Sequence, residues 1–428
     1  MKKLLFIISF LLLFGNSYSQ SIWSTQNSGT VNDLRFSYFV NQQTGWAVGF
    51  YYTIVKTTNG GLNWITQDAN TYQSFVSVYF INDQTGWASG GTLSAEISTI
   101  SKTTNGGQNW DVVYSSTIGL VFKTVFVSQN LGFSVTSKGY ILKSTDLGST
   151  WNTIFSNMSF CFTQCCFLNQ NTGWVIGDYG TILNTTDGGN NWLIQNSNTS
   201  DNLEGIYFSS VSTGYIVGTN GKILKTTNSG QNWISKSANT TYWLNSICFI
   251  NNNTGYIVGG NAFLNDSKNI SSTPVMFRTN NGGENWISQN TPATSTLAVI
   301  NFVNDQTGWA VGRSGTIIKT TNAGSVFIKN INTNLPFQYS LNQNYPNPFN
   351  PSTIIRYQIK DLRFVTLKVY DILGKEIATL VNEKLQPGTY EVPFSINQFS
   401  GYQIPSGIYF YTLRAGDYVE TKKMLMIK

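Results

Sequence analysis

The feature that most constrains this chain is a repeat in which a Phe stands six residues before a Gly, seven times over. The steps between successive Gly residues are 41, 46, 41, 41, 41 and 53. A period near 41 residues indicates one supersecondary unit used many times, as in propellers, solenoids and arrays. The pairs are Phe39 and Gly45, Phe80 and Gly86, Phe126 and Gly132, Phe167 and Gly173, Phe208 and Gly214, Phe249 and Gly255, and Phe302 and Gly308.

Each unit predicts a small antiparallel sheet. In the unit around Gly173, an apolar strand at 165–169 precedes short strands at 174–177 and 181–185, and Trp192 opens a fourth. Short strands separated by turn signals at this spacing are typical of antiparallel sheets, and a ring of such sheets is a β-propeller. We therefore expect an all-β fold that begins with a seven-bladed β-propeller.

A polar turn of eight residues precedes the fourth strand of most units. Ser144–Trp151 follows the pattern Ser-x-Asp-x-Gly-x-Thr-Trp at every specified place. The hydroxyl and the Asp or Asn side chain of such a turn can bond backbone amides within it, and Gly supplies positive φ. The turn recurs at 57–64, 103–110, 185–192, 226–233 and 279–286.

The seventh turn, at 320–327, has Phe327 in place of Trp. Trp23 stands 41 residues before Trp64 with no such turn ahead of it. We expect a strand at 22–25 to complete blade seven, with a strand at 327–331 as the alternative. The turns and their spacing resemble those of Asp-box (sialidase-repeat) propellers, closest to the photosystem II stability and assembly factor-like group. That resemblance implies a fold and leaves the function open.

The two ends of the chain differ from the repeat. Lys2 and Lys3 precede an apolar run at 4–14, which predicts a secretory signal peptide over residues 1–19. No other stretch is apolar enough to span a bilayer. After residue 332 the turns stop, and seven of the nine Pro residues follow. We therefore expect a propeller over 20–332, a linker over 333–344, and a small immunoglobulin-like β-sandwich over 345–428.

The tail resembles the C-terminal sorting domain of the type IX secretion system. The resemblance is carried by Tyr-Pro-Asn-Pro-Phe-Asn-Pro at 345–351, Leu-Lys-Val-Tyr-Asp at 367–371, and the closing Glu-Thr-Lys-Lys-Met at 420–424. It implies Sec export, contact with the type IX machinery, and an extracellular or outer-membrane-surface location. The motif residues matched are Pro346, Asn347, Pro348, Phe349, Gly388, Tyr390, Gly407, Tyr409, Lys422 and Lys423.

The composition argues against catalysis. The chain has no His, which excludes Ser-His and Cys-His nucleophile pairs and His-ligated metals. We expect no catalytic residues, no cofactor and no metal. Residues 21–332 hold 14 Lys and Arg against 13 Asp and Glu, so no basic face for nucleic acid is expected. The sequence predicts a secreted binding or adhesion protein.

The alternative is a secreted glycoside hydrolase or lyase of the Asp-box class. The propeller holds only Arg35, Arg278 and Arg313, whereas sialidase chemistry requires an Arg cluster, and the Phe-Arg-Ile-Pro motif of that family is missing. Two carboxylates with an Arg in the central channel would favour the enzyme. A channel lined by Asn, Ser and aromatic residues would favour binding.

Departures from the repeat are the best candidates for ligand binding. Insertions near 91–98 and 260–274 both link a second strand to a third, and Tyr242 and Trp243 begin a first strand. In an antiparallel blade these segments share one face, here called the insertion face, while the Asp-box turns lie on the other. We predict that it binds a glycan or an extended polypeptide through Tyr242, Trp243, Glu96, Asp266 and Lys268. Burial of Trp243 in the local core is the alternative.

A basic residue recurs on the third strand of six units. A cationic ring is one interpretation, but solvated side chains at the blade edges are the expectation, because such residues are mostly exposed. The six residues are Lys56, Lys102, Lys143, Lys225, Arg278 and Lys319.

Overall fold

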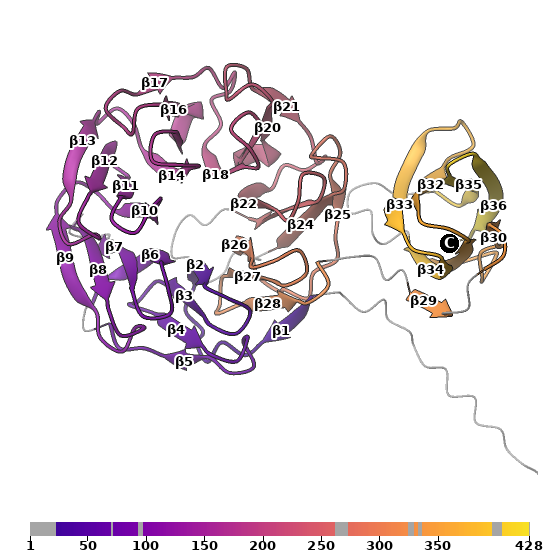
Figure 1. Ribbon diagram of the computed structural model, residues 1–428, viewed down its shortest axis with the longest axis horizontal. Coiled ribbons are helices and arrows are strands. Elements are labelled where there is room, and N and C mark those ends of the chain that lie inside the picture. The colour runs from indigo at the N-terminus through magenta and orange to yellow at the C-terminus, as the bar shows by residue number, and fades with distance from the viewer. Residues whose placement is uncertain are drawn as a thin grey trace, which may run out of the picture.

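The computed structural model shows a ring of seven four-stranded antiparallel sheets and a separate pair of sheets (Figure 1). It describes residues 23–69, 72–92, 97–261, 273–323, 329–332, 336–395 and 405–427. The predicted signal peptide lies outside the described residues. Among the residues described, no helix is long and apolar enough to cross a membrane.

The blades follow one another along the chain, with the first strand of each innermost in the ring (Figure 1). Blades one to three are β2–β5 (Leu34–Phe39, Gly45–Gly49, Ile54–Thr57, Ile65–Thr66), β6–β9 (Ser74–Phe80, Gly86–Thr92, Ile97–Thr103, Asp111–Ser116) and β10–β13 (Val121–Phe126, Gly132–Thr136, Tyr140–Ser144, Asn152–Ser156). Blades four and five are β14–β17 (Phe162–Phe167, Gly173–Gly177, Ile182–Thr185, Leu193–Ile194) and β18–β21 (Leu203–Phe208, Gly214–Gly218, Ile223–Thr226, Ile234–Lys236). Blade six is β22–β25 (Trp243–Phe249, Gly255–Gly260, Pro274–Thr279, Ile287–Ser288), and blade seven is β26–β28 (Leu297–Phe302, Gly308–Gly312, Ile317–Thr320) with β1 (Ser24–Gln26).

The Phe–Gly period has a direct steric cause. In all seven blades the Phe ring lies against the Gly, so that a Cβ on the Gly would come within 2.2–2.8 Å of ring carbons. The ring then stacks on the strand-two aromatic residue of the preceding blade, with centroids 3.5–5.1 Å apart. The stacked pairs are Phe39–Trp309, Phe80–Trp46, Phe126–Trp87, Phe167–Phe133, Phe208–Trp174, Phe249–Tyr215 and Phe302–Tyr256.

Ring closure uses the N-terminal strand. β1 pairs with β28, with Ser24 opposite Lys319, and Trp23 is only 1% exposed. Trp23 meets Phe302 edge-on, as the Trp of each Asp-box turn meets the Phe of its own blade. The prediction that Trp23 supplies the missing fourth strand is confirmed.

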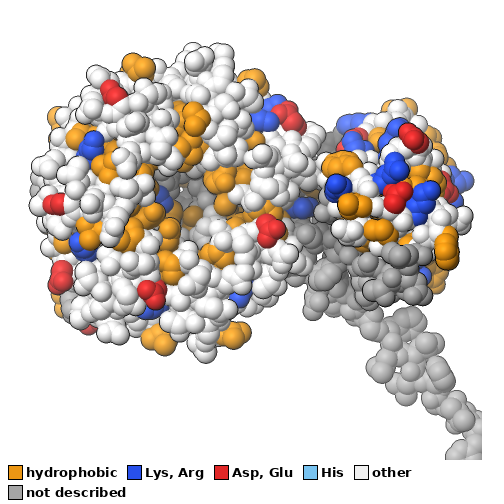
Figure 2. Space-filling view, viewed as in Figure 1, with side chains coloured by type: hydrophobic (Ala, Val, Ile, Leu, Met, Phe, Trp, Pro, Cys, Tyr) orange, Lys and Arg blue, Asp and Glu red, His pale blue; other side chains and the backbone are white. Residues whose placement is uncertain are grey.

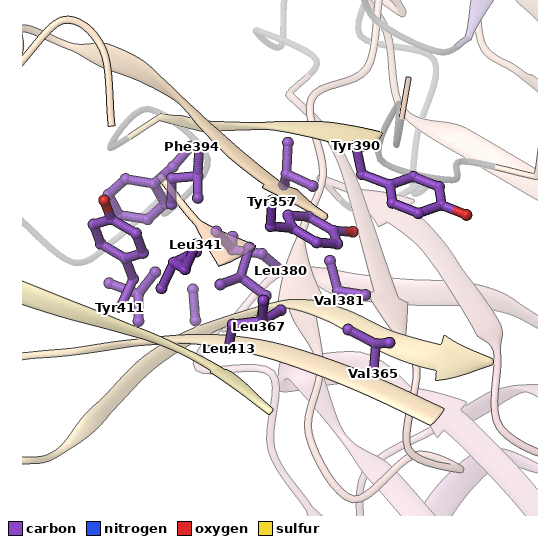
Figure 3. Close-up of a cluster of buried hydrophobic side chains, with 14 of the residues drawn as sticks. Leu341, Tyr357, Val365, Leu367, Leu380, Val381, Tyr390, Phe394, Tyr411 and Leu413 are labelled. Carbon is purple, nitrogen blue, oxygen red and sulfur yellow. The ribbon is translucent and has the colours of Figure 1, made fainter. Parts of the chain in front are cut away.

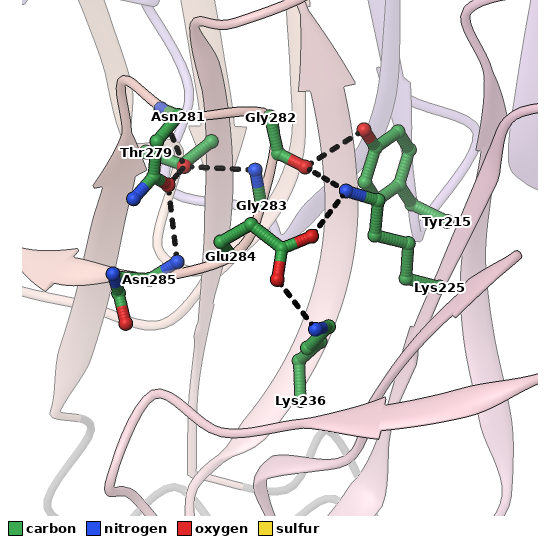
Figure 4. Close-up of polar contacts among 9 residues, drawn as sticks. All are labelled: Tyr215, Lys225, Lys236, Thr279, Asn281, Gly282, Gly283, Glu284 and Asn285. Atoms are coloured by element: carbon green, nitrogen blue, oxygen red, sulfur yellow. Dashed lines mark hydrogen bonds and ion pairs between the residues drawn. The ribbon is translucent and has the colours of Figure 1, made fainter. Parts of the chain in front are cut away.

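The expectation that the strand-three lysines are solvated is wrong. In five seams the lysine ammonium donates to a backbone carbonyl in the Asp-box turn of the next blade, at 2.7–2.8 Å. Around Lys225, Figure 4 shows this contact with Gly282 beside the internal hydrogen bonds of the turn. In the two remaining seams Gln195 donates to Ser229, and Tyr256 donates to Ala323. The same carbonyl of every turn is therefore bonded from the neighbouring blade.

The tail folds as a β-sandwich. One sheet has the order β29-β34-β31-β30 and the other β33-β32-β35-β36, with one apolar core between them (Figure 3). The strands are β29 (Lys329–Asn332), β30 (Ser340–Leu341), β31 (Ser352–Ile359), β32 (Arg363–Tyr370), β33 (Glu376–Leu385), β34 (Gly388–Ser395), β35 (Gly407–Ala415) and β36 (Tyr418–Met426).

The pairing corrects the predicted domain boundaries. β29, which was assigned to the propeller, pairs with β34, and β30, which was assigned to the linker, pairs with β31. Both strands therefore belong to the sandwich by hydrogen bonding. The sequences of these two strands carry neither the repeat of the blades nor a Pro-rich motif. Composition alone therefore could not assign them to the sandwich.

Candidate functional site

A bulge near the start of every innermost strand leaves one residue per blade without a partner in the register. The register shifts near the start of all seven strands, as between Leu34 and Phe36 in β2 and between Leu203 and Gly205 in β18. Bulges re-aim side chains and are frequent next to functional sites. Arg35 and Glu204 are the charged residues among the seven bulged positions, and the other five are Val76, Phe122, Thr163, Asn245 and Ala298.

The charges of Arg35 and Glu204 interact across the ring. The two residues lie on blades one and five, which are not neighbours. The space-filling view shows the ring hollowed at its centre (Figure 2). Asp178, in the short turn η1 (Asp178–Gly180) of blade four, interacts with Glu204. Asp33 and Arg313 lie beside Arg35. These five residues are called the channel mouth.

Burial shifts the pKa values of Glu204, Asp178 and Arg35. The pKa of Glu204 is raised to about 7, mainly by burial and secondly by the charge of Asp178, while Arg35 opposes the shift. Burial also raises the pKa of Asp178, against a hydrogen bond from the Cys161 thiol. Burial lowers the pKa of Arg35 to about 10, while the nearby carboxylates oppose that change. Perturbed carboxylates of this kind are more common at functional sites than elsewhere.

The positive and negative sides of the channel mouth are separate. On the side of blades one and seven, Arg313 Nε lies 3.7 Å from Asp33 Oδ2, and the Arg35 guanidinium lies 5.2 Å from the centroid of the Phe50 ring. The carboxylates of Asp178 and Glu204 come from the adjacent blades four and five. The channel mouth is therefore polarised.

Lys123 lies deeper in the ring. It belongs to β10, and its Nζ lies 3.5 Å from the centroid of the Phe36 ring, which belongs to blade one. Burial lowers the pKa of this ammonium to about 8. Tyr79 and Tyr207, on the first strands of blades two and five, donate their hydroxyls to backbone carbonyls of the next blade. The channel thus combines the charged cluster that would favour an enzyme with the aromatic lining that would favour binding.

Three exposed tyrosines lie on the insertion face in blades one and four. Tyr51, Tyr52 and Tyr179 occupy turns between second and third strands, are 59%, 50% and 80% exposed, and have φ of 53°, 50° and 55°. In the matching turns of blades five and seven, the place of Tyr179 is held by Asn220 and Ser314. Left-handed backbone disfavours bulky side chains, and such strain gathers at functional sites.

The predicted ligand residues are only partly described. Tyr242 is 38% exposed, and Trp243 is half-buried at the first position of β22, opposite Gly260. Trp243 therefore lies at the inner edge of the insertion face, beside the blade-six hairpin that carries an insertion. Glu96, Asp266 and Lys268 lie outside the described residues. The prediction missed the channel mouth and the other tyrosines. The tyrosines at positions 51, 52 and 179, where turn-forming residues are expected, could have indicated this part of the surface.

Comparisons with known families divide the chain in the same way. Residues 343–428 match the family described as secretion system C-terminal sorting domain. Residues 109–198 and 192–274 match photosynthesis system II assembly factor YCF48. The chain pairs a YCF48-like propeller with a C-terminal sorting domain. The sorting domain indicates type IX secretion and an extracellular or cell-surface location.

Solved structures agree on the fold of the YCF48-like propeller. YCF48 bound to D1 peptide has a TM-score of 0.59 and 18% identity, covering 71% of this chain and 96% of that one. YCF48 from Cyanidioschyzon merolae has a TM-score of 0.57 and 19% identity, covering 70% and 98%. The GH74 enzyme of Niastella koreensis has a TM-score of 0.56 and 13% identity, covering 95% and 75%. No curated protein matches the chain.

The motif of the sorting domain holds the sandwich together. Phe349 is 2% exposed, and its amide donates to the Leu425 carbonyl at 3.0 Å, which ties the motif to β36. The side chain of Asn347 accepts the Leu425 amide at 2.8 Å. The Pro346 carbonyl accepts the Thr353 hydroxyl at 2.7 Å. These contacts give the Pro-rich segment a structural role within the domain.

The later motif residues lie on three strands of the sandwich, β34, β35 and β36. Tyr390 and Tyr409 are each buried and donate their hydroxyls to the carbonyl four residues earlier. Gly388 and Gly407 begin β34 and β35. Pro348 follows Asn347 in the exposed part of the Pro-rich segment, Lys422 pairs with Glu420 at 2.9 Å, and the neighbouring Lys423 is exposed.

Proposed function

We propose that this chain is a secreted, non-catalytic binding protein whose propeller holds an extended polypeptide on the insertion face. The observation that carries the proposal is the set of exposed tyrosines in left-handed turns. Tyr51, Tyr52 and Tyr179 occupy a strained backbone conformation yet leave most of their side chains in water. Exposed tyrosines in strained turns contribute little to the stability of the fold, so contact with a ligand explains their presence best.

A polypeptide suits this surface better than a glycan for two reasons. The tyrosines are spread around the rim instead of forming one platform, so an extended chain could contact several of them. The structurally similar YCF48 is itself seen with a peptide bound. The rim also presents Tyr242 and Trp243, so the originally predicted contacts remain part of the proposed site.

The test uses the full chain without its signal peptide on a peptide array and a glycan array. Tyr51→Asn combined with Tyr179→Asn keeps residues that tolerate left-handed backbone, so the fold should be retained or slightly stabilised. We expect binding to peptides on the array to fall at least tenfold in this variant. Leu62→Asn, at an exposed residue of the Asp-box face, is the control. Binding to glycans alone, or unchanged peptide binding in the folded double variant, would refute the proposal.

A second candidate is a glycoside hydrolase or lyase. Two observations favour it: the paired carboxylates of Glu204 and Asp178 with Arg35 nearby, and the structural likeness to a GH74 enzyme. Glycosidases of most families use two carboxylates. Release of reducing ends from a panel of polysaccharides, abolished by Glu204→Gln, would establish this activity in place of simple binding.

A further inference from the structure

We propose that the corner formed by the rings of Tyr52 and Tyr72 binds a proline-rich segment in the polyproline II conformation. The inference rests on the proposed function and names the kind of polypeptide that the insertion face holds. It adds Tyr72, which stands in the loop between blades one and two, to the tyrosines of the turn at 51–52.

The turn that carries Tyr52 differs from its counterparts in other blades. Four blades have Gly at the place of Tyr52, and a Cβ on each would lie 1.9–2.0 Å from a carbonyl oxygen of the loop that leads to the next blade. Those residues are Gly139, Gly180, Gly221 and Gly315. Blade one instead has two consecutive tyrosines in left-handed backbone, Tyr51 and Tyr52, with φ of 53° and 50°. Blade one thus replaces the residue best suited to this turn, at a cost in backbone strain, and places two rings at the surface.

The Tyr52 ring meets a second exposed ring at a right angle. The ring centroids of Tyr52 and Tyr72 lie 5.9 Å apart with an interplanar angle of 88°, and the two residues are 50% and 91% exposed. The amide of Tyr51 donates to the Ser74 hydroxyl at 3.3 Å, which fastens the turn to the start of β6. Two rings at a right angle can contact a ligand ring on two sides, and aromatic-lined grooves bind proline in this way.

The segments that build the corner carry no charge. No Asp, Glu, Lys or Arg occurs from residue 36 to 55 or from 69 to 82. Among the residues that the structure describes, the hydroxyls of Tyr51, Tyr52 and Tyr72 form no hydrogen bond. A polyproline II segment is uncharged along its prolines, and its carbonyls have no internal hydrogen bonds, so they can accept from these hydroxyls. Its preformed conformation also lowers the ordering cost of binding.

The test measures the binding of two peptides and one oligosaccharide to the full chain by NMR titration. Acetyl-deca-proline amide forms polyproline II, an uncharged Gly-Ser peptide of equal length is flexible, and cellohexaose supplies a glycan. We expect deca-proline to bind at least about tenfold more tightly than either of the others, because only deca-proline presents rings and unpaired carbonyls in a preformed backbone.

Two variants each remove one ring of the corner. Tyr52→Gly introduces the residue that four other blades have at this place, so the fold should be retained. Tyr72→Ser changes a residue that is 91% exposed. Each variant should weaken deca-proline binding by about fivefold or more, because one aromatic contact is lost. Met158→Ser is the matched control, at a residue 77% exposed in the corresponding loop between blades three and four, and should leave binding unchanged.

The outcomes separate this inference from the proposed function. Equal affinity for deca-proline and the flexible peptide, tighter binding of cellohexaose, or deca-proline binding that survives both ring variants would overturn the proline site. The proposed function would still stand if array peptides bind and the variant with Tyr51→Asn and Tyr179→Asn loses them. Deca-proline binding that depends on Tyr52 and Tyr72 would support the site, even if that variant keeps its array binding and the proposed function fails.

Discussion

At the scale of single residues, the Phe–Gly period records a steric requirement. Each Gly has no Cβ because the Phe ring of its own blade occupies that space, and the same ring stacks on the previous blade. The Phe and the Gly are therefore two halves of one contact. Their regular recurrence explains why they were poor candidates for ligand binding.

Gly214→Ala should destabilise the propeller. A Cβ at residue 214 would lie 2.4 Å from the Phe208 ring, which has no free space to move into. Overpacking of this kind costs about 1–3 kcal/mol. Urea denaturation should show the loss, and Phe208→Leu in the same chain should make the two effects less than additive. Additive losses would contradict the contact.

Glu204→Gln should stabilise the protein in neutral and alkaline solution. The pKa of Glu204 is raised to about 7 in the folded state, so between its ordinary value and 7 the folded chain holds a proton that the unfolded chain has lost. Stability contributed by this group therefore falls as the pH rises toward 7 and stays low above it. The variant should gain on the order of 1–3 kcal/mol at pH 8 and little near pH 4.5.

Thermal unfolding at several pH values measures that gain. Glu284→Gln is the matched control with the opposite sign, because Lys225 and Lys236 lower the pKa of Glu284. It should lose stability at pH 8. A Glu204→Gln variant that is less stable than the parent at pH 8 would show that Arg35 compensates the carboxylate after all.

At the scale of the elements, the blades are joined by one repeated contact made with different residues. Lysines supply the donor in five seams. In the seam between blades four and five, the strand-three position holds Asn184, which bonds the Gly173 carbonyl of its own blade. Gln195, directly after the fourth strand, supplies the donor that lysine supplies in the other seams. Its side chain donates to the Ser229 carbonyl at 3.1 Å and accepts from Trp233 Nε1 at 3.3 Å.

Gln195→Ala should weaken that seam. It leaves the Ser229 carbonyl and the Trp233 indole without this partner, which costs about 1–3 kcal/mol. Asn184→Lys in the same chain should recover part of the loss, because lysine at this position is the donor in five other seams. Gln231→Ala, at an exposed residue of the same turn, should change stability by less than about 0.5 kcal/mol. Chemical denaturation compares the three.

At the scale of the whole molecule, the ring depends on the segment that follows the predicted signal peptide. β1 joins blade seven from the N-terminal side, and the tail forms its own sheets around its own core. The fold of the propeller therefore draws on residue 23 and not on the sorting domain for its closing strand. Export and ligand binding are assigned to separate sets of strands.

Trp23→Ala should open this closure. Trp23 is buried against Phe302 and Tyr256, and removal of a buried Trp costs about 3–5 kcal/mol. Hydrogen exchange should rise in β26–β28 as well as in β1. Trp286→Ala, which removes the equivalent side chain from blade six, should leave exchange in β28 unchanged. Similar exchange in both variants would contradict the closing role of β1.

The sequence by itself determined the repeat, the number of blades and the sorting tail, and it favoured Trp23 over residues 327–331 for the closing strand. These follow from local patterns, since strand alternation, turn chemistry and the Phe–Gly contact each lie within one unit of about 41 residues. The role of the strand-three lysines could not be predicted, because their hydrogen-bond partners are in the next blade. The sequence showed only that these lysines recur at a regular spacing.

The channel mouth was decided by the tertiary structure. Asp33 and Arg313 are 280 positions apart, and Arg35 and Glu204 belong to blades that never touch, so no spacing along the chain relates them. Each departs from the residue type found at the same position in most other blades, so no regular pattern in the sequence marks them. Closure of the ring brings these residues near one another, and burial there shifts the pKa values of Arg35, Asp178 and Glu204. The repeat determines the blades and their contacts, whereas closure of the ring brings together residues that the repeat does not predict.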